Sequence, residues 1–339
     1  VLLQYAGFNP LSLFPMGRSI RTNYEFQGTI GNIDLVSAWI CLLMPGLLGS
    51  FVLGQKHHWL HLPGGLCAIL LTLLMDVQSG LIVLALTLLA LICLALRQPE
   101  CLARLLLTLG FTLLLFALRQ ALVLPWLDSS ADIEFAPGQV SAVCTLLGVV
   151  LVALAPLLMC HPPRPLPRKG LLALVCAGLL VVVILVVYLP MPEGGALWEL
   201  HELLNGRAQD AFGSERIGVW RMTLEMTAQS PWFGLSPDAF YAAFRDYLDA
   251  TGQTILQNFD NPHNFFLQAM VNSGIPAALL LMLTCAAAIA GALRKRETLP
   301  LAMMAVGFLM QGMFTFSICL TSPMFYAILG LCAAKKAAE

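Results

Sequence analysis

The stretch LLALVCAGLLVVVILVVYLP, residues 171–190, decides the class of fold, because it contains no charged side chain. Its length is close to the about 20 apolar residues that an α-helix needs to cross a bilayer. The whole chain shares this character: of its 339 residues, 59% are hydrophobic and only 11% are charged, and the mean hydropathy is +0.82. A soluble domain needs more charge to cover its surface. The sequence therefore predicts an integral membrane protein.

Further apolar runs are each near the length of a membrane span, which makes nine candidate spans in all. The run at 60–75 is short, and the run at 265–292 is long enough to include a bent or half-buried first turn. We predict an all-α multispan helical bundle with spans near 35–53, 60–75, 80–96, 104–118, 138–159, 171–190, 265–292, 299–317 and 321–334.

Lysine and arginine predict the orientation of the spans, because short cytoplasmic loops carry an excess of both. If residues 1–34 lie outside, the basic loops at 54–59, 97–104, 160–170 and 293–298 lie inside with the C-terminus. That assignment places eleven of the eighteen basic residues inside, including every lysine, and leaves most acidic residues outside. The predicted C-terminus is therefore cytoplasmic.

The basic residues left outside are all arginines. They are Arg18, Arg21, Arg119, Arg207, Arg216, Arg221 and Arg245. Arginine is always charged, and its planar guanidinium fork matches the geometry of phosphate. This bias predicts an anionic ligand on the outer face, and the alternative is chance together with ordinary surface charge.

Two outside segments, 14–39 and 191–262, carry most of the polar side chains. The second segment is much longer than a connector needs to be. Its helix start and stop signals predict a folded lid or platform rather than a disordered loop. The expected helices lie at 196–206, at 214–236 with Ser214 as N-cap, and at 236–252 with Gly252 at the end.

We expect a single polytopic membrane domain over residues 1–339. The opening VLLQYAGFNPLSLF has the character of a helix tail that runs into an outside loop, so we expect further helices upstream. Within the domain we distinguish an outer loop that leads into the first full span, the large loop that carries site residues, and the C-terminal spans. These parts lie at 14–34, 191–262 and 263–334.

The stretch DNPHNFFLQAMVNSGIP, residues 260–276, places polar side chains at the start of a span. Asn261 is a suitable N-cap and Pro262 fits the first helical position, so we expect His263 in the first turn, facing the polar region. The positive end of a helix dipole favours a bound anion and disfavours imidazolium. We therefore predict that neutral His263 accepts a proton from a hydroxyl beside a lipid phosphate. The alternative is an interface histidine that only caps the helix.

Four motifs together resemble those of the O-antigen ligase and Wzy-type polymerase superfamily of membrane glycosyltransferases. Their order, their spacing, their side of the membrane and the large loop between them make a joint signal that no single motif provides. The motifs are Arg-x-x-x-Trp at 216–220, SPWFGLSPDAF at 230–240, His263-Asn264 followed after nine residues by Gly274, and RTNYEFQGTIGNIDLVSAWICLLMP at 21–45.

The resemblance implies a GT-C-type bundle in the bacterial plasma membrane, with the 191–262 loop on the extracytoplasmic side. Such enzymes move a glycan from undecaprenyl diphosphate to an acceptor hydroxyl, invert the anomeric centre, and use neither a metal nor another cofactor. By the family's motifs, His263 is the catalytic base, and Arg216 and Arg21 hold the diphosphate. The further candidates for substrate binding are Arg18, Arg221, Asn264, Trp220 and Asn32.

The same resemblance implies a lipid-linked glycan as donor and membrane lipids as surroundings, with no part for nucleic acid. The acceptor is lipid A-core, another glycan repeat, a wall polymer or a protein hydroxyl. The sequence does not separate these acceptors, so a ligase, a polymerase and a protein O-oligosaccharyltransferase all remain open.

Some of the assigned residues have structural alternatives. Arg216 could pair with Glu215 or Asp210, or it could contact Trp220, which itself could pack inside the loop. KHHWLH, residues 56–61, contains three histidines, but its predicted cytoplasmic position favours a membrane-interface loop over a metal site. The ten cysteines lie almost entirely in or beside apolar runs and are interpreted as packing residues.

Two other classes of function compete with metal-free glycosyl transfer. A metal-dependent GT-C enzyme would use an acidic outside loop, and Asp128, Asp132 and Glu134 form one, although it has no Asp-x-Asp. A transporter or flippase of lipid-linked sugars would carry ionisable or polar groups at mid-membrane. The spans are almost free of charge, with Gln311 among their few polar residues, which favours chemistry at the outer interface.

Overall fold

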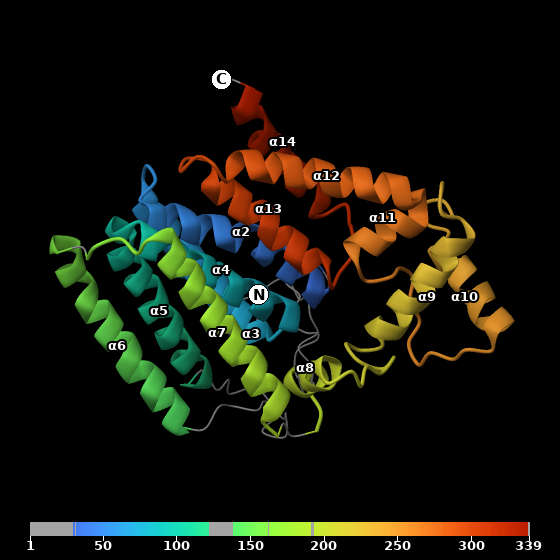
Figure 1. Cartoon of the computed structure of the whole chain (residues 1–339), viewed down its shortest axis with the longest axis horizontal. Helices are drawn as coiled ribbons and strands as arrows, with labels where there is room; N and C mark the ends of the chain where they lie inside the picture. The colour runs from blue at the N-terminus through green and yellow to red at the C-terminus, as the bar shows by residue number, and fades with distance from the viewer. Residues whose placement is uncertain (1–29, 31, 122–137, 162, 191–192, 338–339) are drawn as a thin grey trace, which may run out of the picture. The chain divides into compact units, whose positions relative to one another are not determined.

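The structure is a computed structural model that describes residues 30, 32–121, 138–161, 163–190 and 193–337, and all regular structure in these ranges is helical (Figure 1). Short 3₁₀ helices lie at His58–Leu60 and Pro99–Cys101. The α-helices are α2 (Ile33–Leu53), α3 (His61–Met75), α4 (Gln78–Arg97), α5 (Leu102–Ala121), α6 (Gly138–Cys160), α7 (Arg168–Tyr188), α8 (Ala196–Leu204), α9 (Arg216–Gln229), α10 (Phe240–Thr251), α11 (Phe265–Ser273), α12 (Ile275–Ala292), α13 (Leu299–Gly312) and α14 (Ser322–Ala337).

Seven of the described helices are long and apolar enough to cross a membrane, which confirms the all-α multispan prediction. The predicted run at 265–292 is broken at Gly274 into α11 and α12, as its excess length indicated. The last two predicted spans correspond to shorter apolar helices, because α13 has 14 residues and α14 has 16. The helix expected over 299–317 ends at Gly312.

The chain divides into two compact units, and unit 1 comprises residues 1–167, 289–311 and 323–339. Its core is α2, whose side chains at Leu42, Met44, Leu48 and Phe51 are fully buried. Asn32 begins this helix: its side-chain Oδ1 accepts hydrogen bonds from the backbone N–H groups two and three residues later, at 2.8 and 3.3 Å. A capping bond of this kind satisfies backbone donors that a helix start otherwise leaves without partners.

The loops predicted to share one side meet at one end of unit 1. Arg296 joins three of them, because its guanidinium donates to Leu53 O at 2.8 Å and pairs with Glu100 at 2.8 Å. Gln55 Nε2 donates in return to Arg296 O at 2.7 Å. We call this the basic end of unit 1.

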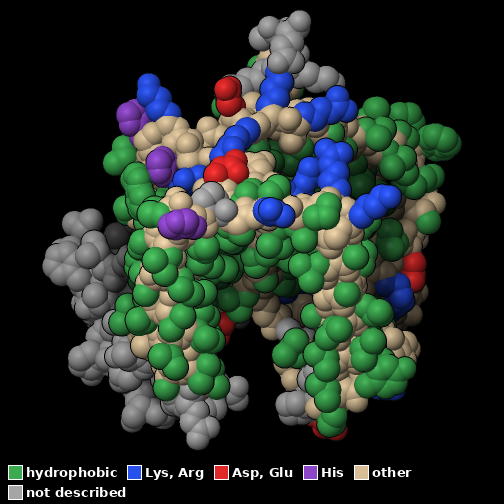
Figure 2. Space-filling view, turned by 60° about the vertical axis from the view of Figure 1, so that its left-hand side comes forward, with side chains coloured by type: hydrophobic (Ala, Val, Ile, Leu, Met, Phe, Trp, Pro, Cys, Tyr) green, Lys and Arg blue, Asp and Glu red, His purple; other side chains and the backbone are tan. Residues whose placement is uncertain are grey.

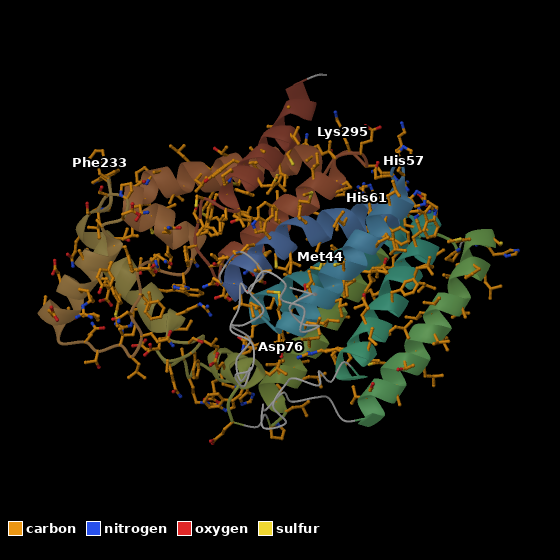
Figure 3. The ribbon with its side chains drawn as sticks, turned by 180° about the vertical axis from the view of Figure 1, so that it is seen from behind. Met44, His57, His61, Asp76, Phe233 and Lys295 are labelled. Atoms are coloured by element: carbon orange, nitrogen blue, oxygen red, sulfur yellow. The ribbon has the colours of Figure 1, made fainter. Side chains whose placement is uncertain are left out.

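The loop at 160–170 and the opposite end of unit 1 are also placed as predicted. Leu166 N donates to Leu96 O at 2.7 Å, which brings the 160–167 loop to the end of α4. Figure 3 shows His57, His61 and Lys295 at the basic end and Asp76 at the other end of α3. On the face that Figure 2 shows, apolar side chains cover the lengths of the helices, and most of the Lys, Arg and His side chains lie at helix ends. Unit 1 thus has the polarity of a membrane-spanning bundle.

Unit 2 comprises residues 168–288 and 312–322 and contains the large loop. The three helices expected in the loop are present as α8, α9 and α10, and α10 ends at Gly252 as predicted, with φ of 66°. α9 and α10 share an apolar core with Phe259 and with α11, and its buried residues are Val219, Met222, Met226, Phe240, Phe244, Phe259 and Val271. The loop is therefore a folded platform, as its sequence indicated.

The predicted starts of the second and third loop helices are wrong, and the second ends at Gln229 and not at 236. Ser214 does not cap α9; the N-cap is Glu215, whose φ of 66° is left-handed and whose side chain makes no capping bond. The Glu215 carboxylate instead accepts the backbone N–H groups of Leu256 and Gln257, both at 2.9 Å. The third helix begins at Phe240 because Ser236 has a φ of 90°, which is incompatible with a helix.

Candidate active site

The backbone around His263 differs from the predicted helix start. The N-cap of α11 is Asn264, whose Oδ1 accepts from Phe266 N and Leu267 N at 3.0 and 3.1 Å. Asn261 forms a separate turn instead, because its Oδ1 accepts the backbone N–H of His263 at 3.0 Å. His263 therefore lies just before the helix, with a left-handed φ of 46°, and not in its first turn.

Two aromatic rings hold the imidazole of His263. Phe259 meets it edge-on at a centroid distance of 5.3 Å and an interplanar angle of 87°. Phe316 meets it at 5.1 Å and 70°. The side chain is half-buried, so the rings restrict its position without closing it off from solvent. This arrangement fixes the imidazole of His263 at the N-terminus of α11.

The segment after α13 supports the same turn. Asn264 Nδ2 donates to Met313 O at 3.1 Å, and Gln268 Oε1 accepts the backbone N–H of Ser317 at 2.7 Å. We predicted residues 313–317 as the last part of the span at 299–317, because the stretch MFTFSICL, residues 313–320, is mostly apolar. The side chain of Asn264 thus has a capping and bracing role, and its contact with substrate stays a prediction.

Trp220 connects the platform to the turn that carries His263. Its indole Nε1 donates to Pro262 O at 3.0 Å, and its ring lies 6.4 Å from that of Phe314, tilted by 43°. The packing alternative for Trp220 therefore has direct structural support. Because Pro262 immediately precedes His263, this hydrogen bond positions the backbone of the proposed base.

Replacing Trp220 with phenylalanine is expected to destabilise the fold by about 0.5–1.5 kcal/mol, because one hydrogen bond to a backbone carbonyl is lost while the ring volume is largely kept. The glycan transfer that the motifs predict is expected to fall by up to about tenfold, through loss of that free energy at the turn. Thermal unfolding in detergent and transfer rates measure the two effects. Trp198→Phe is the matched control, because Trp198 stacks edge-on against Phe212 and its indole N–H has no hydrogen-bond partner in the described part of the chain. Equal losses in the two variants would contradict the positioning role.

Arg216 lies one helical turn before Trp220, and residues four apart on a helix share a face. Its side chain is half-buried, and its Nη1 donates to Gly213 O at 3.3 Å. The Glu215 carboxylate accepts two backbone N–H groups, and the Asp210 carboxylate pairs with Arg221. The structure thus places a guanidinium on the face of α9 that leads to the turn at Pro262.

Arg221, on α9, is held in a network of ion pairs and hydrogen bonds. Its guanidinium pairs with Asp210 at 2.6 Å and with Glu225 at 3.2 Å, and it also donates to Gln253 at 3.3 Å. The hydrogen bond to Asp210 raises the pKa of Arg221 above its ordinary value. The Glu225 carboxylate also accepts the hydroxyl of Tyr247, which raises the pKa of that phenol. A phosphate would have to compete with two carboxylates for Arg221.

Two backbone segments, residues 231–236 and 271–275, lie against each other and hold α11 to the loop before α10. We call this pair of segments the clasp. Leu235 N donates to Val271 O at 2.7 Å, and Ile275 N donates to Pro231 O at 2.8 Å. A Cβ on Gly234 would lie 2.5 Å from Val271 O, and one on Gly274 would lie 2.3 Å from the backbone oxygen of Trp232. Both glycines are part of the motifs found in the sequence. The sequence did not show that each glycine allows the opposite backbone segment to approach closely.

Several predicted residues lie outside the described part of the chain. These are Arg18 and Arg21 of the proposed diphosphate site and Asp128, Asp132 and Glu134 of the acidic loop. Within the described residues, no group of three or more His, Cys, Asp or Glu side chains is placed to hold a metal ion. Unit 2 contains His263, Asn264, Trp220 and Arg216, and the hydrogen bond from Trp220 to Pro262 O links α9 to the turn at His263. Asn32 caps α2 in unit 1.

Comparison with known proteins bears on this region of the chain. Residues 141–282 match the family model described as O-Antigen ligase. The matched range contains the platform helices, the clasp and the turn at His263. None of the curated proteins compared with the chain matches it. The family match confirms the resemblance that the motifs indicated and points to a glycosyltransferase-like ligase or polymerase.

Proposed function

We propose that this protein is a membrane glycosyltransferase that moves a glycan from undecaprenyl diphosphate to an acceptor hydroxyl at the outer face of a bacterial plasma membrane. The observation that carries the proposal is the position of His263. This residue has a strained backbone, lies between two aromatic rings and immediately precedes the N-cap of α11. The O-antigen ligase match over residues 141–282 supplies the reaction class.

The backbone strain at His263 supports a functional role. A non-glycine residue in the left-handed region costs about 1–2 kcal/mol, and such residues cluster at functional sites. Here Asn261 and Trp220 hold the turn in place from both sides through their bonds to His263 N and Pro262 O. The fold thus holds this imidazole in a costly backbone conformation, a cost that it also bears at His57, Glu215 and Ser236.

The proposed reaction is a single displacement. The acceptor oxygen bonds to the anomeric carbon while the bond from that carbon to the diphosphate oxygen breaks, which inverts the centre. The acceptor proton passes to a ring nitrogen of His263, and the electron pair of the broken bond leaves on undecaprenyl diphosphate. His263 then returns the proton to solvent or to the leaving group. A positioned general base contributes about 10²–10⁴ to the rate of such a step.

The negative charge that grows on the diphosphate requires cationic donors. We assign Arg216 to this role, with Arg21 as the second clamp and Arg18 as its competitor. Preorganised guanidinium groups stabilise developing phosphate charge and can stand in for a divalent cation. Arg221 remains a candidate for substrate binding, although a phosphate would have to compete there with Asp210 and Glu225.

Replacing Arg216 with lysine is expected to lower transfer by about tenfold, because lysine keeps the charge but loses the fork that binds phosphate through two bonds. Initial rates at saturating acceptor measure the change. Arg245→Lys is the matched control on the same platform, since Arg245 is exposed and its one side-chain hydrogen bond within the described residues goes to Asn258, at 3.4 Å. A loss of similar size in both variants would assign the effect to the general charge of the platform.

The test of the proposed function is transfer by the purified protein in detergent, with undecaprenyl-diphosphate-linked glycan as donor, in the presence of EDTA. Membrane extract of the host supplies acceptors, and the labelled product identifies which one is used. Transfer that survives EDTA supports the metal-free reaction. If folded protein shows no transfer but moves the lipid-linked glycan between liposome leaflets, the transporter alternative replaces this proposal.

A further inference from the structure

A groove of about 410 Å³ lies at the basic end of unit 1, between α2 and α13. Its volume falls within the range of small-molecule binding sites. The long walls are apolar and formed by Leu43, Leu47, Leu301 and Met304. The mouth is polar, and Lys56, His61 and Glu297 line it. None of these residues has a part in the proposed glycan transfer.

The close approach of α2 and α13 forms the floor of the groove. Gly46 on α2 has no side chain, and a Cβ there would lie 2.2 Å from Met304 Cγ and 3.2 Å from Pro300 O. The flanking Leu43 remains 37% exposed, so an apolar channel is left open at the side of the bundle. The apolar lining of this channel suits a lipid acyl chain, which is as apolar as a leucine side chain.

The loop beside the mouth of the groove has side chains that are typical of the lipid head-group region of a membrane. The adjoining loop exposes Trp59 by 52% and Leu60 by 76%. The Trp59 ring meets Phe51 edge-on at 5.2 Å, which anchors it to the end of α2. Tryptophan is enriched where a membrane protein meets the head groups, because its ring is apolar and its N–H is polar. Figure 3 shows His57, His61 and Lys295 at this same end.

The charges at the mouth are of both signs. Lys56 supplies a cation, His61 a ring that can donate to phosphate, and Glu297 a carboxylate. Lys56 and Glu297 are exposed, and His61 is half-buried. A head group that carries both a phosphate and a primary ammonium complements this set. A purely anionic head group would meet Glu297, and a quaternary ammonium would offer that carboxylate no N–H donor.

We propose that this groove binds a phosphatidylethanolamine-type phospholipid. The phosphate lies against Lys56 and His61, and the ammonium against Glu297. One acyl chain follows Leu43, Leu47, Leu301 and Met304. The site lies in unit 1 and is independent of the proposed transfer reaction, so it holds whatever the enzyme's acceptor is.

The test is photo-crosslinking with diazirine-bearing phospholipids of identical acyl chains and three head groups: phosphoethanolamine, phosphocholine and phosphoglycerol. The purified protein in detergent is irradiated with each lipid, digested, and the adducts are mapped to peptides. We expect adducts on residues 43–50 and 300–304, with the ethanolamine lipid about two- to fivefold above the others, the range that one exposed ion pair provides. Equal yields from the three lipids, or a higher yield from the glycerol lipid, would overturn the proposal.

Glu297→Gln provides the discriminating variant, because it removes the carboxylate and keeps the size and polarity of the side chain. Its yield with the ethanolamine lipid is expected to fall about two- to fivefold, and its yield with the glycerol lipid to rise. Arg164→Gln is the matched control, since Arg164 is exposed at the same basic end and does not line the groove. An unchanged preference in Glu297→Gln, or the same shift in both variants, would show that bulk surface charge and not the groove selects the lipid.

Discussion

Replacing His263 with asparagine is expected to lower glycan transfer by about 10²–10⁴-fold while the fold is retained. Asparagine cannot act as a base at neutral pH, so the acceptor hydroxyl loses its proton acceptor. Asparagine is, however, among the residues that tolerate left-handed backbone, and His263 has a φ of 46°. The substitution therefore separates the chemistry of the side chain from the geometry of the turn.

Two measurements decide this prediction. Transfer rates with undecaprenyl-diphosphate-linked glycan are expected to fall, and the thermal unfolding midpoint in detergent is expected to stay close to that of the wild type. Trp220→Phe offers the contrasting pattern, with a small loss of both transfer and stability. If His263→Asn retains transfer, the histidine is not the base, and its strained backbone serves the fold alone.

Replacing Gly274 with alanine is expected to cost about 2–5 kcal/mol of stability in unit 2 and to remove most transfer activity. With φ of 88° and ψ of 166°, Gly274 occupies a region that is essentially restricted to glycine. The added Cβ would also lie 2.3 Å from Trp232 O and 2.5 Å from the carbon bonded to it. Because backbone atoms give way only when the clasp opens, α11 would shift and carry His263 with it.

Gly252→Ala is the matched control for this change. Gly252 also has a positive φ, 66°, but a Cβ there would meet nothing within 4 Å. Its expected cost is only the about 1–2 kcal/mol of left-handed backbone. Gly234→Ala tests the other side of the clasp and is expected to resemble Gly274→Ala, because its Cβ would lie 2.5 Å from Val271 O. Similar unfolding midpoints for Gly252→Ala and Gly274→Ala would refute the interlocked geometry.

The predicted polarity of unit 1 came from composition and charge placement. Long uncharged runs must form helices that satisfy their own backbone in lipid, so their number, length and approximate ends can be predicted from the letters alone. The sorting of lysine and arginine into short loops predicted which loops share an end, and the bonds around Arg296 confirm that grouping. For the break at Gly274, the sequence indicated only that the apolar run at 265–292 is longer than one span needs.

The details of the candidate site depended on tertiary structure. Both Asn261 and Asn264 have the chemistry of an N-cap, and local sequence does not decide between them. The segment at 313–317 decided it, because Met313 O accepts the amide of Asn264 and the ring of Phe316 packs on His263. Those partners are about fifty residues away in the sequence, so no local pattern contains them.

The sequence by itself therefore determined the class of fold, the membrane-spanning helices, the folded platform and the candidate residues of the site. Those features follow from hydrophobic length, charge placement and motif spacing, all of which are local. Tertiary structure alone decided that Arg221 is bound by carboxylates, that Trp220 holds the backbone before His263, and that Gly234 and Gly274 interlock. These depend on which backbone and side-chain groups meet across the fold, where steric fit and hydrogen-bond partners are set by residues distant in the chain.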